Sequence, residues 1–160
     1  MAIDPRIAFL RHSLATLAYR GGKALSGAPA GFSDFKEREG SRTPGQILAH
    51  IGDLMDWAFH LVQGRHVWTD SAPQVWQDDV ARFFTAMKRL DDALAQPETP
   101  GSEPERIFQG PIADALTHVG QIAMLRRMAG APVRGENYFK AEIAAGRIDA
   151  ATGGPRVEFD

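Results

Sequence analysis

Four stretches of this chain place apolar residues three and four positions apart, the spacing of one face of an amphipathic helix. The first stretch begins at Asp4-Pro5, where a residue type that caps helices precedes a proline suited to the first helical position. Gly21-Gly22 is expected to weaken this helix near its end. Its apolar stripe consists of Ile3, Ile7, Leu10, Leu14 and Leu17.

Two further helices carry signals for their first residues. Thr43-Pro44-Gly45-Gln46 predicts a capping box at the start of the second helix, which Gly64 is expected to end. Ser71-Ala72-Pro73-Gln74 predicts the same device at the start of the third helix. The apolar positions are Ile47, Ile51, Leu54, Ala58 and Leu61 in the second helix, and Trp76, Val80, Phe83, Met87, Leu90 and Leu94 in the third.

A fourth helix is expected to begin at Gly110-Pro111 and to end at about Ala129, before Gly130 and Pro132. It is apolar on nearly all sides up to Arg126-Arg127, so we expect it to be mostly buried. Apolar groups on both sides would also allow a homodimer, although a bundle core could absorb them.

The segments between these helices read as loops. Residues 26–42 and 96–104 are rich in turn-forming residues, and Ser102 to Glu105 could start a short helical turn. Residues 136–146 could hold one short helix, and the tail after them looks irregular. No segment alternates polar and apolar residues as a strand does, so the predicted fold is all-α, a four-helix bundle. Two long loops leave the order of helix directions open.

The length of 160 residues fits one domain, residues 1–160, with a core over about 3–130 and a C-terminal extension over 131–160. A net charge of −2 gives no electrostatic reason to expect nucleic acid or an anionic membrane as a partner. The absence of cysteine excludes disulfides, thiolate metal sites and a cysteine nucleophile. The chain shows neither a signal peptide nor a long apolar run. We therefore expect a cytoplasmic protein that acts on a small molecule.

The chemistry of interest lies in the fourth helix. Asp114 and His118 are one helical turn apart on one face, and no lysine or arginine lies within a turn of Asp114. A buried carboxylate needs a partner, which must come from another element or from a metal ion. His50 on the second helix points toward the edge of the core, whereas Asp53, Asp56 and His60 fall on its polar side.

Together His50, Asp114 and His118 would form a three-ligand metal site, with the two ligands on the fourth helix spaced as the histidines of HExxH are. Three protein ligands leave a position open for water or substrate, which is typical of a catalytic site. Trp57 and Gln121 lie on the same sides of their helices as the candidate ligands and are candidates for substrate contact. Core packing is the favoured role of Trp57, and an interhelical hydrogen bond explains Gln121 equally well.

Simpler explanations exist for each residue. His50 could bond to a backbone carbonyl, and Asp114 could favour a helix N-terminus or pair with a distant arginine. Arg126-Arg127 could be a charge pair at a helix C-terminus or a site for an acidic cosubstrate. The remaining histidines, His12, His60 and His66, look like surface residues, with His12 as a reserve ligand.

Two segments carry a resemblance to a known family. TPGQILAHIGDLMDW (43–57) and DALTHVGQIAMLRRMAG (114–130) resemble the histidine motifs of the DinB/YfiT-like superfamily, four-helix bundles regarded as metalloenzymes. That family carries one metal-binding histidine on the second helix and two, four residues apart, on the last long helix. The resemblance, which covers roughly residues 3–130, places His50 and His118 as ligands. Asp114 stands where the family has a histidine, and Val119 replaces its usual arginine.

The resemblance also implies an activity. Characterised members include a mycothiol-dependent maleylpyruvate isomerase and bacillithiol transferases. It therefore implies a divalent metal, zinc or nickel in the first place, that holds a low-molecular-weight thiol as thiolate for transfer or isomerisation. A metal-dependent hydrolase and a non-catalytic bundle that binds a small ligand are the alternatives.

Overall fold

The computed structural model describes residues 4–96, 98, 100–149 and 156–159 of the chain. The described part is helical and contains no strand apart from an isolated bridge between Glu136 and Glu158. The all-α prediction is therefore confirmed. The long helices are α1 (Pro5–Leu25), α2 (Pro44–Val62), α3 (Trp76–Leu94) and a continuous helical run of α4 (Pro104–Ile107), the π-helical turn η2 (Phe108–Ile112) and α5 (Ala113–Met128). Two 3₁₀ turns, η1 (Phe32–Asp34) and η3 (Tyr138–Lys140), lie in the connecting segments.

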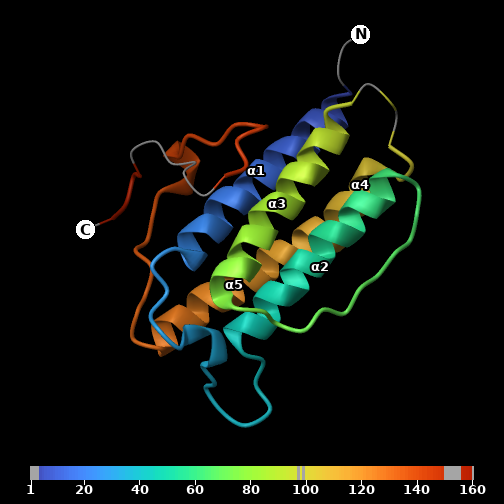
Figure 1. Ribbon diagram of the computed structural model, residues 1–160. Helices are drawn as coiled ribbons and strands as arrows, with labels where there is room; N and C mark the ends of the chain where they lie inside the picture. Colours follow the sequence, from blue (N-terminus) through green and yellow to red (C-terminus); the bar gives the residue numbers. More distant parts are fainter. Residues whose placement is uncertain (1–3, 97, 99, 150–155, 160) are drawn as a thin grey trace.

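The four long helical segments form a bundle in which α1 and α2 each lie between α3 and α5 (Figure 1). α1 and the α4–α5 run point one way along the bundle, and α2 and α3 point the other way. Because α2 and α3 are parallel neighbours, residues 63–75 must return along the whole bundle, and we call this segment the crossover loop (Figure 1). Simple up-down-up-down order is thereby excluded.

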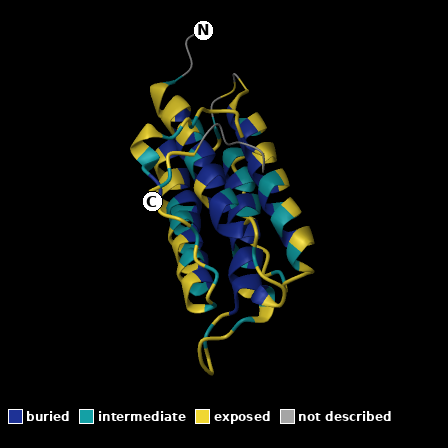
Figure 2. Ribbon diagram, turned by 90° about the vertical axis from the view of Figure 1, so that its left-hand side faces the viewer, coloured by how far each residue is buried: buried dark blue, intermediate teal, exposed yellow. Residues whose placement is uncertain are grey.

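The predicted apolar stripes face inward and form one core, and the exposed residues lie on the outside of the bundle (Figure 2). Ile3, which the sequence places in the first stripe, lies outside the described residues. α1 does not weaken at Gly21-Gly22 but continues to Leu25. A Cβ atom at Gly21 would lie 2.4 Å from the ring of Phe83, so this glycine lets α3 approach α1 closely.

Two of the predicted helix starts are confirmed. Asp4 accepts a hydrogen bond from the backbone N–H of Arg6, at 2.8 Å. At α2 the Thr43 hydroxyl accepts from the Gln46 N–H at 3.2 Å, and the Gln46 side chain accepts from the Thr43 N–H at 2.9 Å. Both signals use only neighbouring residues, which is why the sequence alone could locate them.

The predicted capping box at Ser71 is wrong. α3 begins at Trp76, and Ser71 instead donates its hydroxyl and its backbone N–H to the carboxylate of Asp53, at 2.7 and 2.8 Å. Asp53 was placed on the polar side of α2 but its side chain is 1% exposed. Arg82 of α3 donates to Asp53 at 2.6 Å and to Asp56 at 2.7 Å. Gly52 makes room for this guanidinium, since a Cβ there would lie 2.7 Å from an Arg82 nitrogen.

The fourth helix differs from the prediction in start and in burial. It begins at Pro104, so the short turn expected at Ser102 to Glu105 runs directly into it, and Gly110-Pro111 falls inside the π-helical turn. Only one face of α5 packs on α1 and α2, and its buried residues are Ala115, Val119, Ile122 and Arg126. The expectation of a mostly buried helix is therefore wrong; the exposed side includes Thr117, Gly120, Gln121, Met124, Arg127 and Met128.

Arg126 is not a surface charge at the end of its helix. Its guanidinium is buried and donates to the carbonyl oxygens of Ala24, Ser26, Gly27 and Ala131. Three of these carbonyls lie at and just beyond the end of α1, where carbonyls lack helical partners and a cation is favoured. Arg126 therefore ties the ends of α1 and α5 together, and binding an acidic cosubstrate is excluded for this side chain.

The C-terminal segment is held on α1 by a buried ion cluster. Lys23 donates to Glu136 at 2.9 Å and to Glu158 at 3.0 Å, and Tyr19 donates to Glu136. The Glu136 side chain is fully buried, and Ile148 from the same segment joins the core.

The short helix expected within residues 136–146 is the 3₁₀ turn Tyr138–Lys140. Residues 150–155 and 160 of the tail, and 97 and 99 of the loop before α4, lie outside the described residues.

This cluster predicts a pH window for docking of the C-terminal segment. Burial raises the pKa of Glu136, but hydrogen bonds from Tyr19 and Lys23 outweigh it, and the pKa lies below its usual 4.5. Burial and the hydrogen bond to Glu136 raise the pKa of Tyr19 from 10.0 to about 12. An acid whose pKa is lowered by folding stabilises the folded state above its unfolded-state pKa. A tyrosine whose pKa is raised by folding stabilises the folded state below its unfolded-state pKa. Docking should weaken as the pH falls below 4.5 and as it rises from 10.0 to about 12.

The methyl NMR signals of Ile148 report this transition, with those of Ile51 in the bundle core as the control. We expect Ile148 to lose its buried chemical shift at both ends of the window before Ile51 does, and Glu136→Gln to abolish the acid limb. Simultaneous loss of both signals would show that the segment has no separate docking equilibrium.

Candidate metal centre

The structure brings His50, Asp114 and His118 together where α2 faces α5. The Nε2 atom of His50 lies 3.5 Å from a carboxylate oxygen of Asp114, and the Nδ1 atom of His118 lies 3.2 Å from the other. The two imidazole rings are tilted by 60° to each other, with their centroids 4.7 Å apart. Two helices thus contribute the three side chains that the sequence singled out.

A hydrogen bond fixes the orientation of His118. Its Nδ1 atom lies 2.8 Å from the backbone carbonyl oxygen of Asp114, one turn earlier in the helix. A carbonyl oxygen only accepts, so Nδ1 must carry the hydrogen, and Nε2 of the neutral ring keeps its lone pair. Metal-ligating histidines in proteins are commonly held this way, with the second ring nitrogen donating to a carbonyl or carboxylate.

Asp114 lies at the rim of the site and not inside it. Its side chain is 45% exposed, whereas those of His50 and His118 are 22% and 12% exposed. The prediction of a buried carboxylate is wrong because this edge of α5 is open to solvent. The alternative of a helix N-terminus is also excluded, since α4 and the π-helical turn precede Asp114 in the same run. Its partners are the two histidines, and no arginine among the described residues pairs with it.

The donor set fits a divalent metal ion. One potential ligand atom from each residue lies within 4.8 Å of the other two. Ligand atoms bound to one zinc ion at about 2.0–2.2 Å stand roughly 3.0–3.5 Å apart, so the three side chains would move closer together around an ion. Two imidazoles and one carboxylate suit zinc and related divalent metals, and they leave coordination positions for small ligands.

A pair of tryptophans covers the His50 side of the centre. Trp68 of the crossover loop packs edge-on against His50, with ring centroids 5.6 Å apart, and against Trp57, at 5.9 Å. Trp57 also lies against Gly110 in the π-helical turn, where a Cβ atom would be 3.7 Å from the indole. Trp57 therefore supports the wall, while Trp68, 49% exposed, is the tryptophan that presents a ring to solvent there. Substrate contact by Trp57 stays a prediction.

A pocket of about 380 Å³ opens beside His50. On one side the pocket is lined by Arg42, which precedes α2, and by Gln46 and His50 of α2. The crossover loop contributes Asp70, Ser71, Ala72 and Pro73. Sequence reasoning missed Arg42, Asp70 and Trp68. No helical spacing pointed to them, because all three lie in segments outside the helices.

Gln121 lies one turn beyond His118 on the exposed side of α5. It lines a neighbouring hollow together with Arg42 and Met124, and its contact with substrate stays a prediction. The other histidines lie apart from the centre, as expected: His12 and His66 are exposed, and the Nδ1 atom of His60 is 3.1 Å from a nitrogen of Arg65.

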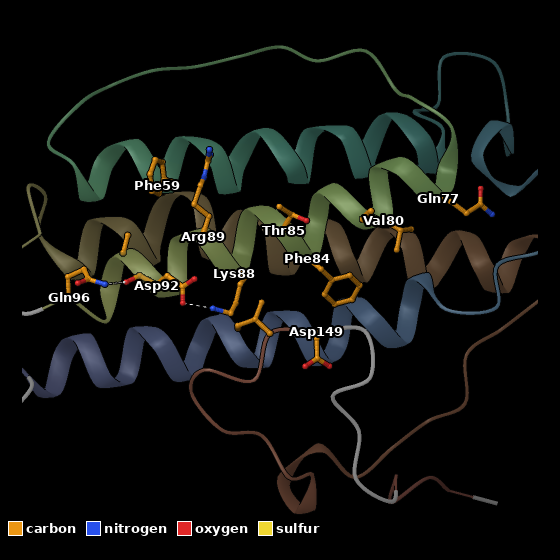
Figure 3. Close-up of a pocket in the computed structure, with 13 residues that line it drawn as sticks. Phe59, Gln77, Val80, Phe84, Thr85, Lys88, Arg89, Asp92, Gln96 and Asp149 are labelled. Atoms are coloured by element: carbon orange, nitrogen blue, oxygen red, sulfur yellow. Dashed lines mark hydrogen bonds and ion pairs between the residues drawn. The ribbon is translucent and has the colours of Figure 1, made fainter.

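A wider hollow of about 890 Å³ lies on the outer face of α3 and includes none of the three candidate ligands (Figure 3). Val80 and Phe84 form its apolar floor, and Lys88 is already paired with Asp92 at its edge. The C-terminal segment closes one side through Ile148 and Asp149. Arg89 at its edge is likewise paired, with Asp56, and none of the candidate ligands lines this hollow, so the chemistry is assigned to the pocket at His50.

Comparisons of the chain with protein families, with curated proteins and with solved structures find no match. Within the part of the chain that the structure describes, no helix combines the length and the apolar character that crossing a membrane requires. The centre must therefore be interpreted from its own geometry.

The hydrogen bond to the Asp114 carbonyl predicts the tautomer of His118. In metal-free protein at pH 8 we expect His118 to carry its proton on Nδ1, as long-range ¹H–¹⁵N correlation spectra would show. Exposed His12, which has no such acceptor, should show the Nε2–H form that predominates in free imidazole side chains, or a mixture. A proton on Nε2 of His118 would contradict the orientation described here.

Proposed function

We propose that the protein is a metal-dependent enzyme whose His50, Asp114 and His118 bind one divalent ion, zinc or nickel, and whose substrates include a low-molecular-weight thiol. The observation that carries the proposal is the convergence of three potential ligand atoms from two helices, beside a pocket that His50 lines. A bound divalent ion would lower the pKa of a thiol ligand and so provide a nucleophile at neutral pH.

The roles of the protein's own residues follow from their positions. His50 and His118 would supply neutral nitrogen ligands, and the backbone carbonyl of Asp114 keeps His118 in the required tautomer. Asp114 would supply one negative charge from the solvent-exposed rim. Trp68 and Trp57 exclude water from the His50 side of the centre.

Two further arguments favour a thiol as the cosubstrate. The chain has no cysteine, so any sulfur nucleophile must arrive as a small molecule. Residues 43–57 and 114–130 also resemble the motifs of DinB-type proteins, whose characterised members use such thiols. A transferase or an isomerase is the reaction class that this resemblance favours.

Metal content tests the first part of the proposal. Untagged protein purified without chelator should contain about one divalent ion per chain by inductively coupled plasma mass spectrometry, as three protein ligands imply. His50→Ala, Asp114→Ala and His118→Ala should each weaken metal affinity by more than about 100-fold, beyond the effect of losing an outer-shell contact. His66→Ala and Asp78→Ala, at exposed positions, are the matched controls. Wild-type protein that neither contains nor takes up zinc, nickel or manganese would refute the proposal.

Spectra of the cobalt-substituted protein test the second part. A thiol that enters the coordination sphere should add a sulfur-to-cobalt charge-transfer band in the near ultraviolet, absent from His118→Ala. Turnover of ester or amide substrates by metal-loaded protein without any thiol, and no such band, would favour a hydrolase in place of a thiol-dependent enzyme.

A further inference from the structure

The pocket beside His50 has two chemically different walls. One wall consists of Arg42, which precedes α2, and of Gln46 and His50, which lie one helical turn apart on α2. The other wall is the end of the crossover loop, which contributes Asp70 and Ser71. The pocket volume of about 380 Å³ lies at the small end of the range for ligand pockets, so the pocket suits a molecule with few heavy atoms.

Two opposite charges in this pocket have no protein partner. In the described ranges, neither Arg42 nor Asp70 makes an ion pair or a hydrogen bond, and they are not paired with each other although they line one small pocket. On α2, by contrast, Asp53 and Asp56 both bind Arg82. Arg42 and Asp70 are exposed, so both charged groups are accessible to a ligand in the pocket.

The wall that holds Asp70 is fixed in place. Ser71, the next residue, is bonded twice to the buried carboxylate of Asp53, and Trp68 packs on His50. On the opposite wall, the Gln46 side-chain oxygen is used by the capping box, which leaves its amide nitrogen free to donate. The pocket therefore offers a guanidinium and an amide donor on one side and a carboxylate on the other.

We propose that this pocket binds the amino-acid end of a zwitterionic ligand, with its carboxylate on Arg42 and its ammonium group on Asp70, while the other end of the ligand reaches the metal centre. Only the contact between the ligand and the metal ion rests on the proposed function; the binding of its amino-acid end does not. Arg42 would orient the ligand by charge-assisted hydrogen bonds, for which the planar guanidinium suits a carboxylate. Asp70 would discriminate against ligands that carry a carboxylate alone.

The size of the pocket limits the length of the ligand. Gln46 stands about 6 Å before His50 along the α2 axis, because an α-helix rises about 1.5 Å per residue, and Arg42 precedes the helix in the chain. A volume of about 380 Å³ favours a ligand with a short chain between its metal-binding atom and its amino-acid carbon.

A matched series of small probes tests the proposal. Homocysteine carries a thiol and both charged groups, 4-mercaptobutyrate lacks the ammonium group, and 3-mercaptopropylamine lacks the carboxylate. The oxygen analogues homoserine, 4-hydroxybutyrate and 3-aminopropanol extend the series to ligands without sulfur. Dissociation constants are measured by ligand-observed NMR on zinc-loaded protein and on chelator-treated protein.

We expect homocysteine to bind more tightly than either truncated probe. Arg42→Gln should weaken homocysteine and 4-mercaptobutyrate by about tenfold, the usual cost of losing a charge-assisted hydrogen bond, and leave 3-mercaptopropylamine unchanged. Asp70→Asn should weaken homocysteine and 3-mercaptopropylamine and leave 4-mercaptobutyrate unchanged or tighter. Arg127→Gln and Glu142→Gln remove exposed charges outside the pocket and should change nothing.

The outcomes separate this inference from the proposed function. Equal affinities for the three members of both series, or affinities that ignore Arg42 and Asp70, would overturn the inference even if the protein binds zinc. Dependence on Arg42 alone would overturn it in favour of a simple carboxylate ligand. If the protein binds no metal, the same ranking of homoserine over its truncated analogues in chelator-treated protein would support the pocket by itself, and its absence would refute it.

Discussion

The ion pair between Asp53 and Arg82 holds together the part of the molecule on which the candidate site depends. α2 and α3 are parallel neighbours, so the chain between them has to return along the bundle without support from a helix or strand of its own. Asp53 fixes the end of that crossover loop through Ser71, and it fixes α3 through Arg82. Burial lowers the pKa of Arg82, but its hydrogen bonds to Asp53 and Asp56 outweigh that effect and hold the pKa above its ordinary value, so the guanidinium stays charged. One buried carboxylate thereby sets both the distance between two helices and the wall of the pocket.

Patterns that depend on neighbouring residues could be predicted from the sequence. The apolar stripes and the Thr43–Gln46 capping box involve contacts within one or two helical turns, and they occur as expected. Ser71 carried the same local signal, but a buried acceptor on another helix bound it instead. Asp53 lay on the polar side of α2 when that helix was considered alone, because its partner Arg82 belongs to a helix that the pattern could not position.

The candidate site shows the same division. The three candidate ligands could be predicted because two of them are one helical turn apart, and because residues around all three resemble a known family. Arg42, Asp70 and Trp68 could not, since two of these residues lie on a loop whose path follows from helix direction. The exposure of Asp114 was also missed, because the apolar character of the helix does not reveal which of its faces lacks a neighbour.

The π-helical turn at Phe108–Ile112 determines how the α4–α5 run meets the core. Ile107 and Ile112 are both fully buried although they are five residues apart, a spacing that would place them on different sides of an ordinary α-helix. The wider turn, which also accommodates Pro111 without an N–H group, returns both side chains to the core. From Ala115 onward the normal period resumes with Val119 and Ile122. The two halves of the run therefore keep separate rotational phases, and the first half can adapt to α1 without turning Asp114 and His118 away from His50.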